Sequence, residues 1–338
     1  MREALFYDKL DENKVLCRLC HHHCHIASGK RGLCGVRENR DGILTTLVYG
    51  KMVAEHIDPI EKKPLFHFLP ASTSYSIATV GCNFRCAHCQ NFEISLYPHT
   101  PGAVIPGQER TPADIVQRAE RAGCQSISYT YVEPTIFHEF AADCAELAHA
   151  RGIKNVFVSN GYMGEEVTRA LAPVLDGINI DIKAFTETFY KEVCKARLAP
   201  VLENVRLMHE LGVWVEITTL LIPGLNDSPA ELRDLARFIK GVHPGIPWHV
   251  TAFHPTYRML DRPPTPSHLL QQAREIGLTE GLRFVYTGNI PGAQGENTFC
   301  PACQTLLLRR LGFRILENRL ADGGRCPACG EAVEGVWG

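Results

Sequence analysis

The sequence has no uninterrupted apolar run of the about 20 residues that a membrane-spanning helix needs. Its first residues, MREALFYDKLDENKV, also lack the apolar core of a secretory signal peptide. We therefore expect a cytoplasmic protein with no membrane partner.

An excess of charge of either sign is also missing. The 35 Lys and Arg residues against 37 Asp and Glu residues leave a formal net charge of −2. Broad binding of nucleic acid would require a positive field, so a nucleic-acid partner is not expected. With 338 residues and a hydrophobic content of 45%, the chain is long enough for one large core with small appendages, and disorder is not expected.

Cysteine, in contrast, is plentiful, with 14 residues. A cytoplasmic chain keeps its thiols reduced, so these cysteines do not predict a disulfide framework. Eleven of them fall in three groups, which are Cys17, Cys20, Cys24 and Cys34; Cys82, Cys86 and Cys89; and Cys300, Cys303, Cys326 and Cys329. Such grouping indicates metal sites. The other three, Cys124, Cys144 and Cys194, are predicted to be buried free thiols.

The fold is predicted from residue 74 onward, where short β-rich runs alternate with amphipathic helical stretches. This alternation is typical of parallel β/α units. The predicted strands are residues 74–80, 125–131, 154–160, 177–183, 214–222, 248–253 and 283–288. About six units are too few for a closed eight-fold barrel, so the predicted class is α/β with a partial, open β/α barrel.

Two cysteine-rich segments lie outside this repeat. The sequence predicts a Cys-rich N-terminal domain with a connector over residues 1–73, the barrel over 74–294, and a C-terminal zinc-ribbon-like domain over 295–338. The segment DPIEKKPLFHFLP, residues 58–70, is expected to be an ordered connector and not a strand or helix of the core.

The central cysteine group has the spacing C-x3-C-x2-C, directly after the first predicted strand. Zinc with His88 as fourth ligand is one interpretation, but structural zinc favours paired C-x2-C knuckles and no second knuckle is nearby. A 4Fe-4S cluster held through three of its irons fits the spacing better. Its fourth iron would be open to the amino and carboxylate groups of S-adenosylmethionine (SAM).

This motif, placed where β/α barrels keep their chemistry, resembles the radical SAM superfamily. The resemblance implies an enzyme that reductively cleaves SAM to a 5′-deoxyadenosyl radical, which abstracts hydrogen from a substrate. Glu133 and Pro134 stand in the position of the superfamily's Gly-Gly-Glu-Pro-type motif, so Glu133 is expected to pair with the methionine ammonium group. The two glycines are replaced by residues 130–132, Thr-Tyr-Val, which leaves the neighbouring backbone contacts open.

Other predicted strand ends match the same pattern. Ser159, Asn160 and Gly161 resemble the Asn-Gly strand end that contacts the cofactor in activating enzymes. His88 stands where the superfamily usually has an aromatic residue near the adenine, and residues 221–227 resemble the loop that covers the adenosine.

Asp181 and Lys183 are expected to share the lumen face of their strand because strand side chains alternate. They are either a structural ion pair or part of the site, and they resemble the Asp-x-Lys pair of pyruvate formate-lyase activating enzymes. His254 is a candidate for contact with the substrate, and its alternative is a loop histidine with satisfied hydrogen bonds.

The terminal cysteine groups predict further metals. In the C-terminal domain, which we call the tail, the two C-P-A-C knuckles predict zinc, with a rubredoxin-like iron site as alternative. In the Cys-rich N-terminal domain, which we call the head, four cysteines predict either zinc or an auxiliary 4Fe-4S cluster. The head histidines are expected to be solvated neighbours and not ligands; they are His21, His22, His23 and His25.

Across its length the chain resembles the AmmeMemoRadiSam-system radical protein, which is often labelled pyruvate formate-lyase activating enzyme-like. The matching segments are GLCGVRENRDG, HIDPIEKKPLFHFLP and NTFCPACQ. The resemblance implies an unidentified substrate, either a small molecule or a protein, an electron donor such as flavodoxin or ferredoxin, and partners from the same system. Activation of a glycyl radical enzyme is one alternative function. A non-catalytic zinc-binding interaction module is an alternative of another class.

Overall fold

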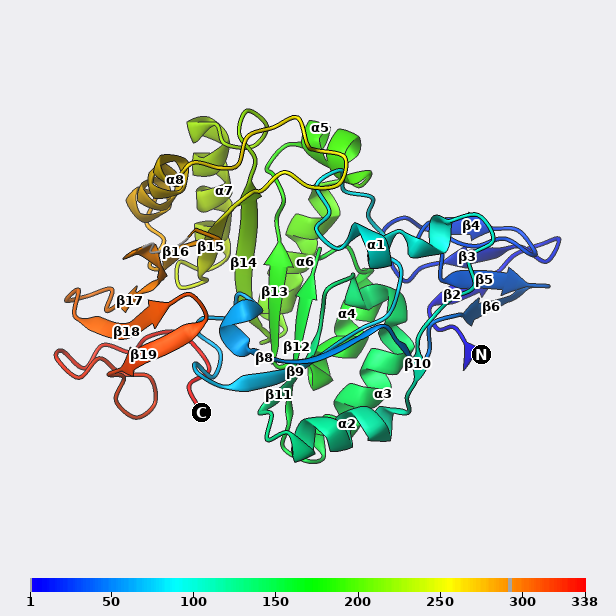
Figure 1. The fold of residues 1–338 in the computed structure, drawn as a ribbon, viewed down its shortest axis with the longest axis horizontal. Coiled ribbons are helices and arrows are strands. Elements are labelled where there is room, and N and C mark those ends of the chain that lie inside the picture. Colours follow the sequence, from blue (N-terminus) through cyan, green and yellow to red (C-terminus); the bar gives the residue numbers. More distant parts are fainter. Residues whose placement is uncertain (1, 291–293) are drawn as a thin grey trace.

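The computed structural model describes residues 2–290 and 294–338. Its centre is one eight-stranded sheet with the order β16-β15-β14-β13-β12-β11-β9-β8 (Figure 1). The strands from β9 to β16 are parallel, and they are β9 (Thr73–Ala78), β11 (Ser126–Tyr129), β12 (Lys154–Ser159), β13 (Gly177–Asp181), β14 (Trp214–Leu221), β15 (Trp248–Ala252) and β16 (Val285–Gly288). Every predicted strand overlaps one of them. The sheet does not close, because β16 and β8 are its two ends, which confirms the partial, open barrel.

The eighth strand was not predicted. β8 (Ala54–Pro59) pairs antiparallel with β9, and Asp58 and Pro59 belong to it. The prediction that the connector contains no strand of the core is therefore wrong at its start, and the 3-10 helix η1 (Ile60–Lys62) follows. As an edge strand, β8 tolerates charged residues and a terminal proline, so it lacks the apolar signature of the central strands.

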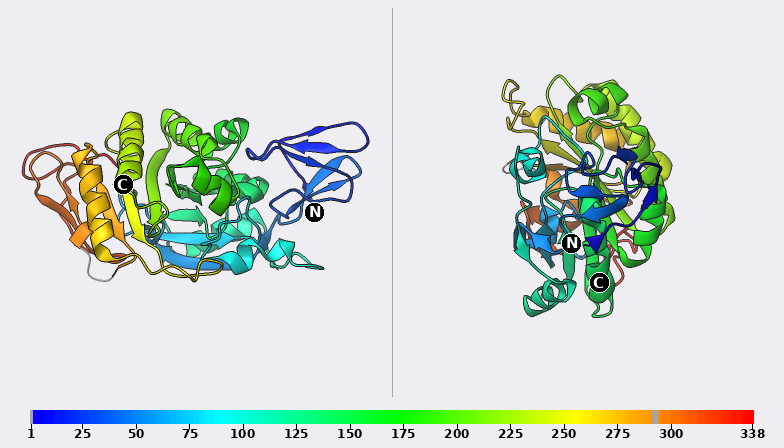
Figure 2. Two further views of the ribbon diagram at one scale, coloured as in Figure 1. Left: turned by 90° about the horizontal axis from the view of Figure 1, so that it is seen from above. Right: turned by 90° about the vertical axis from the view of Figure 1, so that its right-hand side faces the viewer.

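Helices link the parallel strands and cover the outside of the sheet (Figures 1 and 2). The longer ones are α2 (Pro112–Arg121), α3 (His138–His149), α4 (Glu165–Leu171), α6 (Ala199–Glu210), α7 (Pro229–Val242) and α8 (Ser267–Thr279). In α2 the Thr111 hydroxyl accepts from the Asp114 N–H while the Asp114 carboxylate accepts from the Thr111 N–H, so a capping box starts the helix. Its apolar residues Ile115, Val116 and Ala119 face the core.

The head consists of two small antiparallel sheets, and a third pairing joins it to the segment before α2. Their strands are β1 (Arg2–Glu3), β6 (Ile43–Thr46) and β5 (Arg37–Arg40); β2 (Tyr7–Lys9), β3 (Val15–Cys17) and β4 (Cys24–Ile26); and β7 (Lys51–Met52) with β10 (Gln108–Glu109). Arg37 of the head forms a buried ion pair with Glu139 of α3, and the same Glu139 oxygen accepts from the Leu5 N–H at 2.8 Å. The head is therefore joined to the barrel through desolvated charges.

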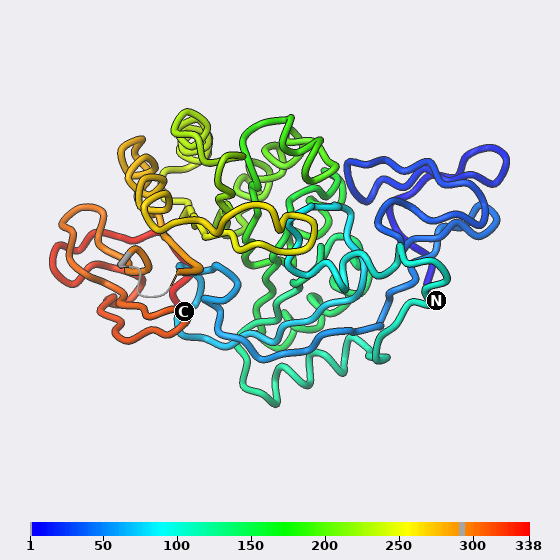
Figure 3. Tube along the Cα trace, turned by 45° about the horizontal axis from the view of Figure 1, so that its top comes forward, coloured from blue at the N-terminus to red at the C-terminus, as the bar shows by residue number. Residues whose placement is uncertain are grey.

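The tail forms a three-stranded antiparallel sheet of β17 (Thr298–Phe299), β18 (Leu306–Leu311) and β19 (Arg314–Asn318). It lies at the end of the molecule opposite the head (Figure 3). Cys300 and Cys326 share a small core with Phe66 of the connector, with Phe284 just before β16 and with Tyr286 of β16. Tail, connector and barrel thus pack together.

A buried carboxylate on β14 organises this junction. Glu216 accepts hydrogen bonds from the main-chain N–H groups of Phe66 and His67, at 3.0 and 2.8 Å, and from the Trp214 indole at 3.0 Å. His249 Nε2 lies 2.6 Å from Glu216 Oε2, the oxygen that also accepts from Phe66. Burial alone would raise the pKa of Glu216, but the hydrogen bond and charge of His249 hold that pKa below its usual value.

None of the helices described in residues 2–290 and 294–338 is both long and apolar enough to cross a bilayer.

Candidate functional site

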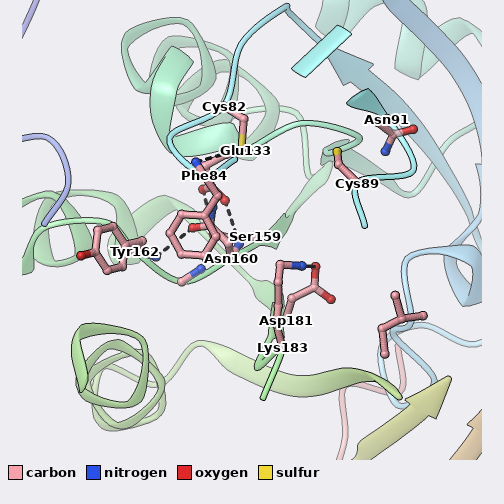
Figure 4. Close-up of polar contacts among 12 residues, drawn as sticks. Cys82, Phe84, Cys89, Asn91, Glu133, Ser159, Asn160, Tyr162, Asp181 and Lys183 are labelled. Carbon is pink, nitrogen blue, oxygen red and sulfur yellow. Dashed lines mark hydrogen bonds and ion pairs between the residues drawn. The ribbon is translucent and has the colours of Figure 1, made fainter. Parts of the chain in front are cut away.

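The three central cysteines lie on one loop, residues 79–91, that leaves the C-terminal end of β9. We call it the cysteine loop. Cys86 is buried, and Cys82 and Cys89 are half-buried. The Cys82 sulfur accepts from the Phe84 N–H at 3.4 Å, and the Cys89 thiol lies 3.7 Å from the Ser95 hydroxyl. The loop is thus held from within, and Cys82 and Cys89 lie near the ends of the neighbouring strands (Figure 4).

Two asparagines join this loop to the next strands. Asn91 donates to the Tyr131 carbonyl after β11 at 2.7 Å, and Asn160 after β12 donates to the Asn83 side chain at 2.7 Å. Tyr131 has a φ of +64°, a region that favours glycine, and it occupies the segment where the resemblance expected glycines. Its hydroxyl donates to Asp58, which supports this conformation. Tyr131 therefore adopts, without glycine, a backbone conformation that glycine would ordinarily provide.

Glu133 is completely buried among donors of its own chain. One oxygen accepts from the Thr135 N–H, the Thr135 hydroxyl and the Ser159 hydroxyl, at 3.1, 2.5 and 2.8 Å. Among the residues that the structure describes, the other accepts only from the Asn160 N–H, at 2.7 Å. Burial raises the pKa of Glu133, and these hydrogen bonds partly oppose the shift. The carboxylate therefore ties the ends of β11 and β12 together and keeps acceptor capacity on the second oxygen.

The strand end after β12 needs its glycine. Gly161 has a φ of +69°, and a Cβ there would lie 2.8 Å from the Ile180 side chain. Its N–H donates to the Ser159 hydroxyl at 3.0 Å. This turn sets the direction of Asn160 toward the cysteine loop.

Asp181 and Lys183 are brought together as an ion pair of 3.0 Å at the end of β13. The Lys183 main-chain N–H donates to the Tyr190 hydroxyl, and its carbonyl accepts from Asn226. Burial would lower the pKa of Lys183, but the charge of Asp181, followed by that of an ionised Cys86, raises it well above its usual value. The pair therefore lies within electrostatic range of the cysteine loop, and the lysine is held in its charged form.

The two predicted histidines lie in different surroundings. His88 is buried beside Phe189, and burial followed by the Lys183 charge lowers its pKa to about 3. Its Nδ1 has no hydrogen-bond partner within the described part of the chain. His254 is exposed, and its ring nitrogen lies 3.3 Å from the Asn289 carbonyl oxygen. Among the residues described, no hydrogen bond joins His254 to the other predicted site residues.

Sequence reasoning missed a neighbour of the cysteine loop. Cys194 is a buried free thiol, as predicted, but it interacts with Cys86, and this interaction, followed by burial, raises the pKa of the Cys86 thiol well above its usual value. It ends the π-helix η5 (Tyr190–Cys194), whose carbonyl groups at residues 193 and 194 accept from the N–H groups of Ala87 and Arg85, both at 3.0 Å. Only the fold brings these distant residues together, so no spacing in the sequence could have revealed the contact.

The tail cysteines form a compact group. Cys300 and Cys329 have sulfurs 3.6 Å apart, as do Cys303 and Cys326, and all four lie within 4.8 Å of one another. Tetrahedral zinc with Zn–S bonds of about 2.3 Å needs sulfurs ~3.8 Å apart. The hydrogen bond from the Thr305 hydroxyl lowers the pKa of Cys303 to about 6, which favours the thiolate. The residues present therefore fit one metal ion, in agreement with a zinc-ribbon-like extension.

The other two cysteine groups are wider. Within residues 2–290 and 294–338, the tail cysteines are the only group of three or more ligands found compact enough to hold one metal ion, and neither the head nor the cysteine loop forms such a group. In the head, Cys17 and Cys24 face each other across β3 and β4. A wide set suits a cluster, in which each thiolate binds a different iron, better than it suits one zinc ion.

Comparisons with known proteins agree with this geometry. Residues 76–239 match the family model described as the Radical SAM superfamily. The chain is 48% identical to an uncharacterised protein of Methanocaldococcus jannaschii over 99% of each chain. It is 26% identical to the isethionate sulfite-lyase activating enzyme of Desulfovibrio desulfuricans over 50% of this chain and 57% of that protein.

A crystal structure of a domain of pyruvate-formate lyase-activating enzyme from Bacteroides vulgatus matches with a TM-score of 0.42 and 18% identity, covering 48% of this chain and 98% of that chain. The superfamily implies a 4Fe-4S cluster and SAM, and the cysteine loop with its wide thiols is consistent with the first of these. The chain belongs to the radical SAM superfamily of enzymes.

Proposed function

We propose that this enzyme holds a 4Fe-4S cluster through Cys82, Cys86 and Cys89 and cleaves SAM reductively to abstract hydrogen from a substrate. The observation that carries the proposal is the hydrogen bonding of the cysteine loop to the neighbouring strand ends, through Asn91 and Asn160. When bound, the cluster would supply the electron that breaks a carbon–sulfur bond of SAM and releases the 5′-deoxyadenosyl radical.

The residues around the loop suit a cationic cofactor. The second oxygen of Glu133 accepts a single hydrogen bond from the described part of the chain, so it is available to the methionine ammonium group. His88 is neutral because burial lowers its pKa to about 3, so it adds no positive charge beside the sulfonium. Its Nδ1, which has no partner among the described residues, is available to a ring edge of the adenine. Ser159 supports the proposal as a positioning residue, since its hydroxyl orients Glu133.

Asp181 and Lys183 are proposed to act together. Lys183 is charged and neutralised by Asp181 at 3.0 Å, so the pair presents both a donor and an acceptor near the cysteine loop without adding net charge. Their place at the end of β13 suits contact with the cofactor or with the group that loses hydrogen. His254 stays a prediction for substrate contact on the exposed side.

The test compares Cys86→Ala with Cys124→Ala, which removes a buried thiol away from the loop. In anaerobic protein reduced with dithionite, Cys86→Ala should form no 5′-deoxyadenosine, while the control should keep the activity of the wild type. In the wild type, the electron paramagnetic resonance signal of the reduced cluster should change shape when SAM is added. A Cys86→Ala protein that still forms 5′-deoxyadenosine would rule out this assignment.

The substrate is either a small molecule or a protein. A glycyl radical enzyme is the alternative that the similarity to the isethionate sulfite-lyase activating enzyme favours. The appearance of a glycyl radical signal in a candidate partner enzyme, dependent on SAM and on Cys86, would identify that role. Partners from the AmmeMemoRadiSam system stay a prediction. A colourless zinc protein without SAM cleavage would instead support the interaction-module alternative.

The terminal metals complete the proposal. We assign zinc to the tail on the basis of its sulfur spacing. In the head, zinc and an auxiliary 4Fe-4S cluster remain the two candidates, and a second reduced-cluster signal that does not respond to SAM would identify the cluster.

A further inference from the structure

A pocket of about 540 Å³ lies where the head meets the barrel. We call it the basic pocket, and it is lined by His21, His22, His23, Tyr162, Lys191, Lys195, Ala196 and Arg197. None of the described residues that line it is acidic. This composition is unusual for a chain whose formal net charge is −2, so the positive charge is local.

The charge of the pocket comes from three exposed side chains, Lys191, Lys195 and Arg197. In the described part of the chain none of the three forms an ion pair within the 4.0 Å that defines one. Arg197 is held in place by contacts to the Tyr162 hydroxyl and the His21 carbonyl, at 3.4 and 3.3 Å. Glu187 and Glu203 lie within electrostatic range of Arg197, but neither lines the pocket, so the charged side chains of the lining are all positive.

Both walls of the pocket are bonded to the cysteine loop. On one wall, His22 Nε2 lies 2.7 Å from the carbonyl oxygen of Asn83, the residue that follows Cys82. On the other, Lys191 belongs to η5, and the carbonyl groups at residues 193 and 194 accept from the N–H groups on either side of Cys86. From the His22 ring, one hydrogen bond and one peptide unit lead to a cysteine of the proposed cluster.

We propose that the basic pocket docks a small acidic electron-transfer protein that reduces the cluster. The proposal rests on the proposed function, because it assigns the reductant of the same site. One electron would pass from the reduced centre of the partner to the cluster; no bond forms or breaks and no proton moves. Complementary charge guides such encounters and raises their rate, and the route through His22 and Asn83 makes the encounter productive.

The experiment uses reduced flavodoxin as the probe and the triple variant Lys191→Gln, Lys195→Gln and Arg197→Gln. The control variant is Arg121→Gln, Arg233→Gln and Arg314→Gln, which changes the net charge equally at exposed residues elsewhere. At low ionic strength the pocket variant should form 5′-deoxyadenosine about tenfold more slowly with flavodoxin than the control does, since steering changes rates by 10-fold or more. The difference should shrink as salt is added.

Dithionite separates the two proposals, because a small chemical reductant needs no docking surface. The pocket variant should keep the dithionite-driven rate of the wild type. If wild-type protein forms no 5′-deoxyadenosine with dithionite, the proposed function fails; if it does and the flavodoxin rates of both variants are equal, the docking proposal fails. Equal rates together with saturable binding of inorganic phosphate to the wild type alone would make the pocket a small-anion site and would equally overturn the docking.

Discussion

Replacing Glu216 by glutamine keeps the shape of the side chain but exchanges one acceptor for a donor. If the amide nitrogen takes the place of the oxygen that is bonded to His67 and Trp214, it faces two N–H groups and has no acceptor there. If it takes the place of the other oxygen, it faces the N–H of Phe66, but a neutral His249 can accept from it through Nε2. The second orientation is therefore preferred, and it leaves one buried main-chain N–H without an acceptor.

The size of the effect follows from that orientation. A buried donor without a partner costs about 1–3 kcal/mol, and each of the two remaining N–H bonds loses its charged acceptor, at ~1 kcal/mol each. The free energy of unfolding of Glu216→Gln should thus fall by roughly 3–5 kcal/mol. For a chain of this size that corresponds to a drop in Tm on the order of 10 °C.

Thermal unfolding of the anaerobic, metal-loaded protein at pH 7, followed by near-ultraviolet circular dichroism, measures this drop. The matched control is Glu165→Gln, which removes an exposed carboxylate paired with Arg169 at 2.8 Å and should cost ~0.5 kcal/mol or less. If Glu216→Gln unfolds as close to the wild type as the control does, Glu216 does not hold the connector and the tail against the barrel.

Three further changes have defined outcomes. Cys329→Ser should lose the tail zinc but keep the iron content of the wild type, measured by elemental mass spectrometry, because its sulfur belongs to the compact group alone; retained zinc would contradict the assignment. Cys194→Ala should lower the reduction potential of the cluster in a spectroscopic titration, because it removes a polar thiol that interacts with Cys86; an unchanged potential would show that this neighbour has no influence. Burial lowers the pKa of His138 to about 4, so the folded state does not take up the proton that the unfolded state gains as the pH falls below 6.5. Between pH 7 and pH 5 this group should cost roughly 2 kcal/mol of stability, and urea titrations of His138→Leu should show a shallower loss than the wild type; equal slopes would refute it.

The strands of the barrel were predictable because each central strand is buried on both sides, and its sequence is therefore a run of residues that favour β-structure. The edge strand β8 was not, since an edge strand carries Glu55 and His56 at low cost. In the site, the pairing of Asp181 with Lys183 follows from the alternation of side chains, and the structure confirms the contact. The three hydrogen bonds to one Glu133 oxygen were not predictable. Two of them come from Thr135 in the following turn, and they depend on the path of the backbone there.

The joining of the head to α3 limits how a large substrate can approach. Separating Arg37 from Glu139 would leave a buried charge without its partner, which costs about 3–5 kcal/mol. The head also contacts the cysteine loop through His22 and pairs Cys20 with Met163 after β12. It therefore behaves as a fixed wall and not as a flap. A large substrate would therefore have to reach the cysteine loop past this wall, since displacing the head would expose the cost of the broken ion pair.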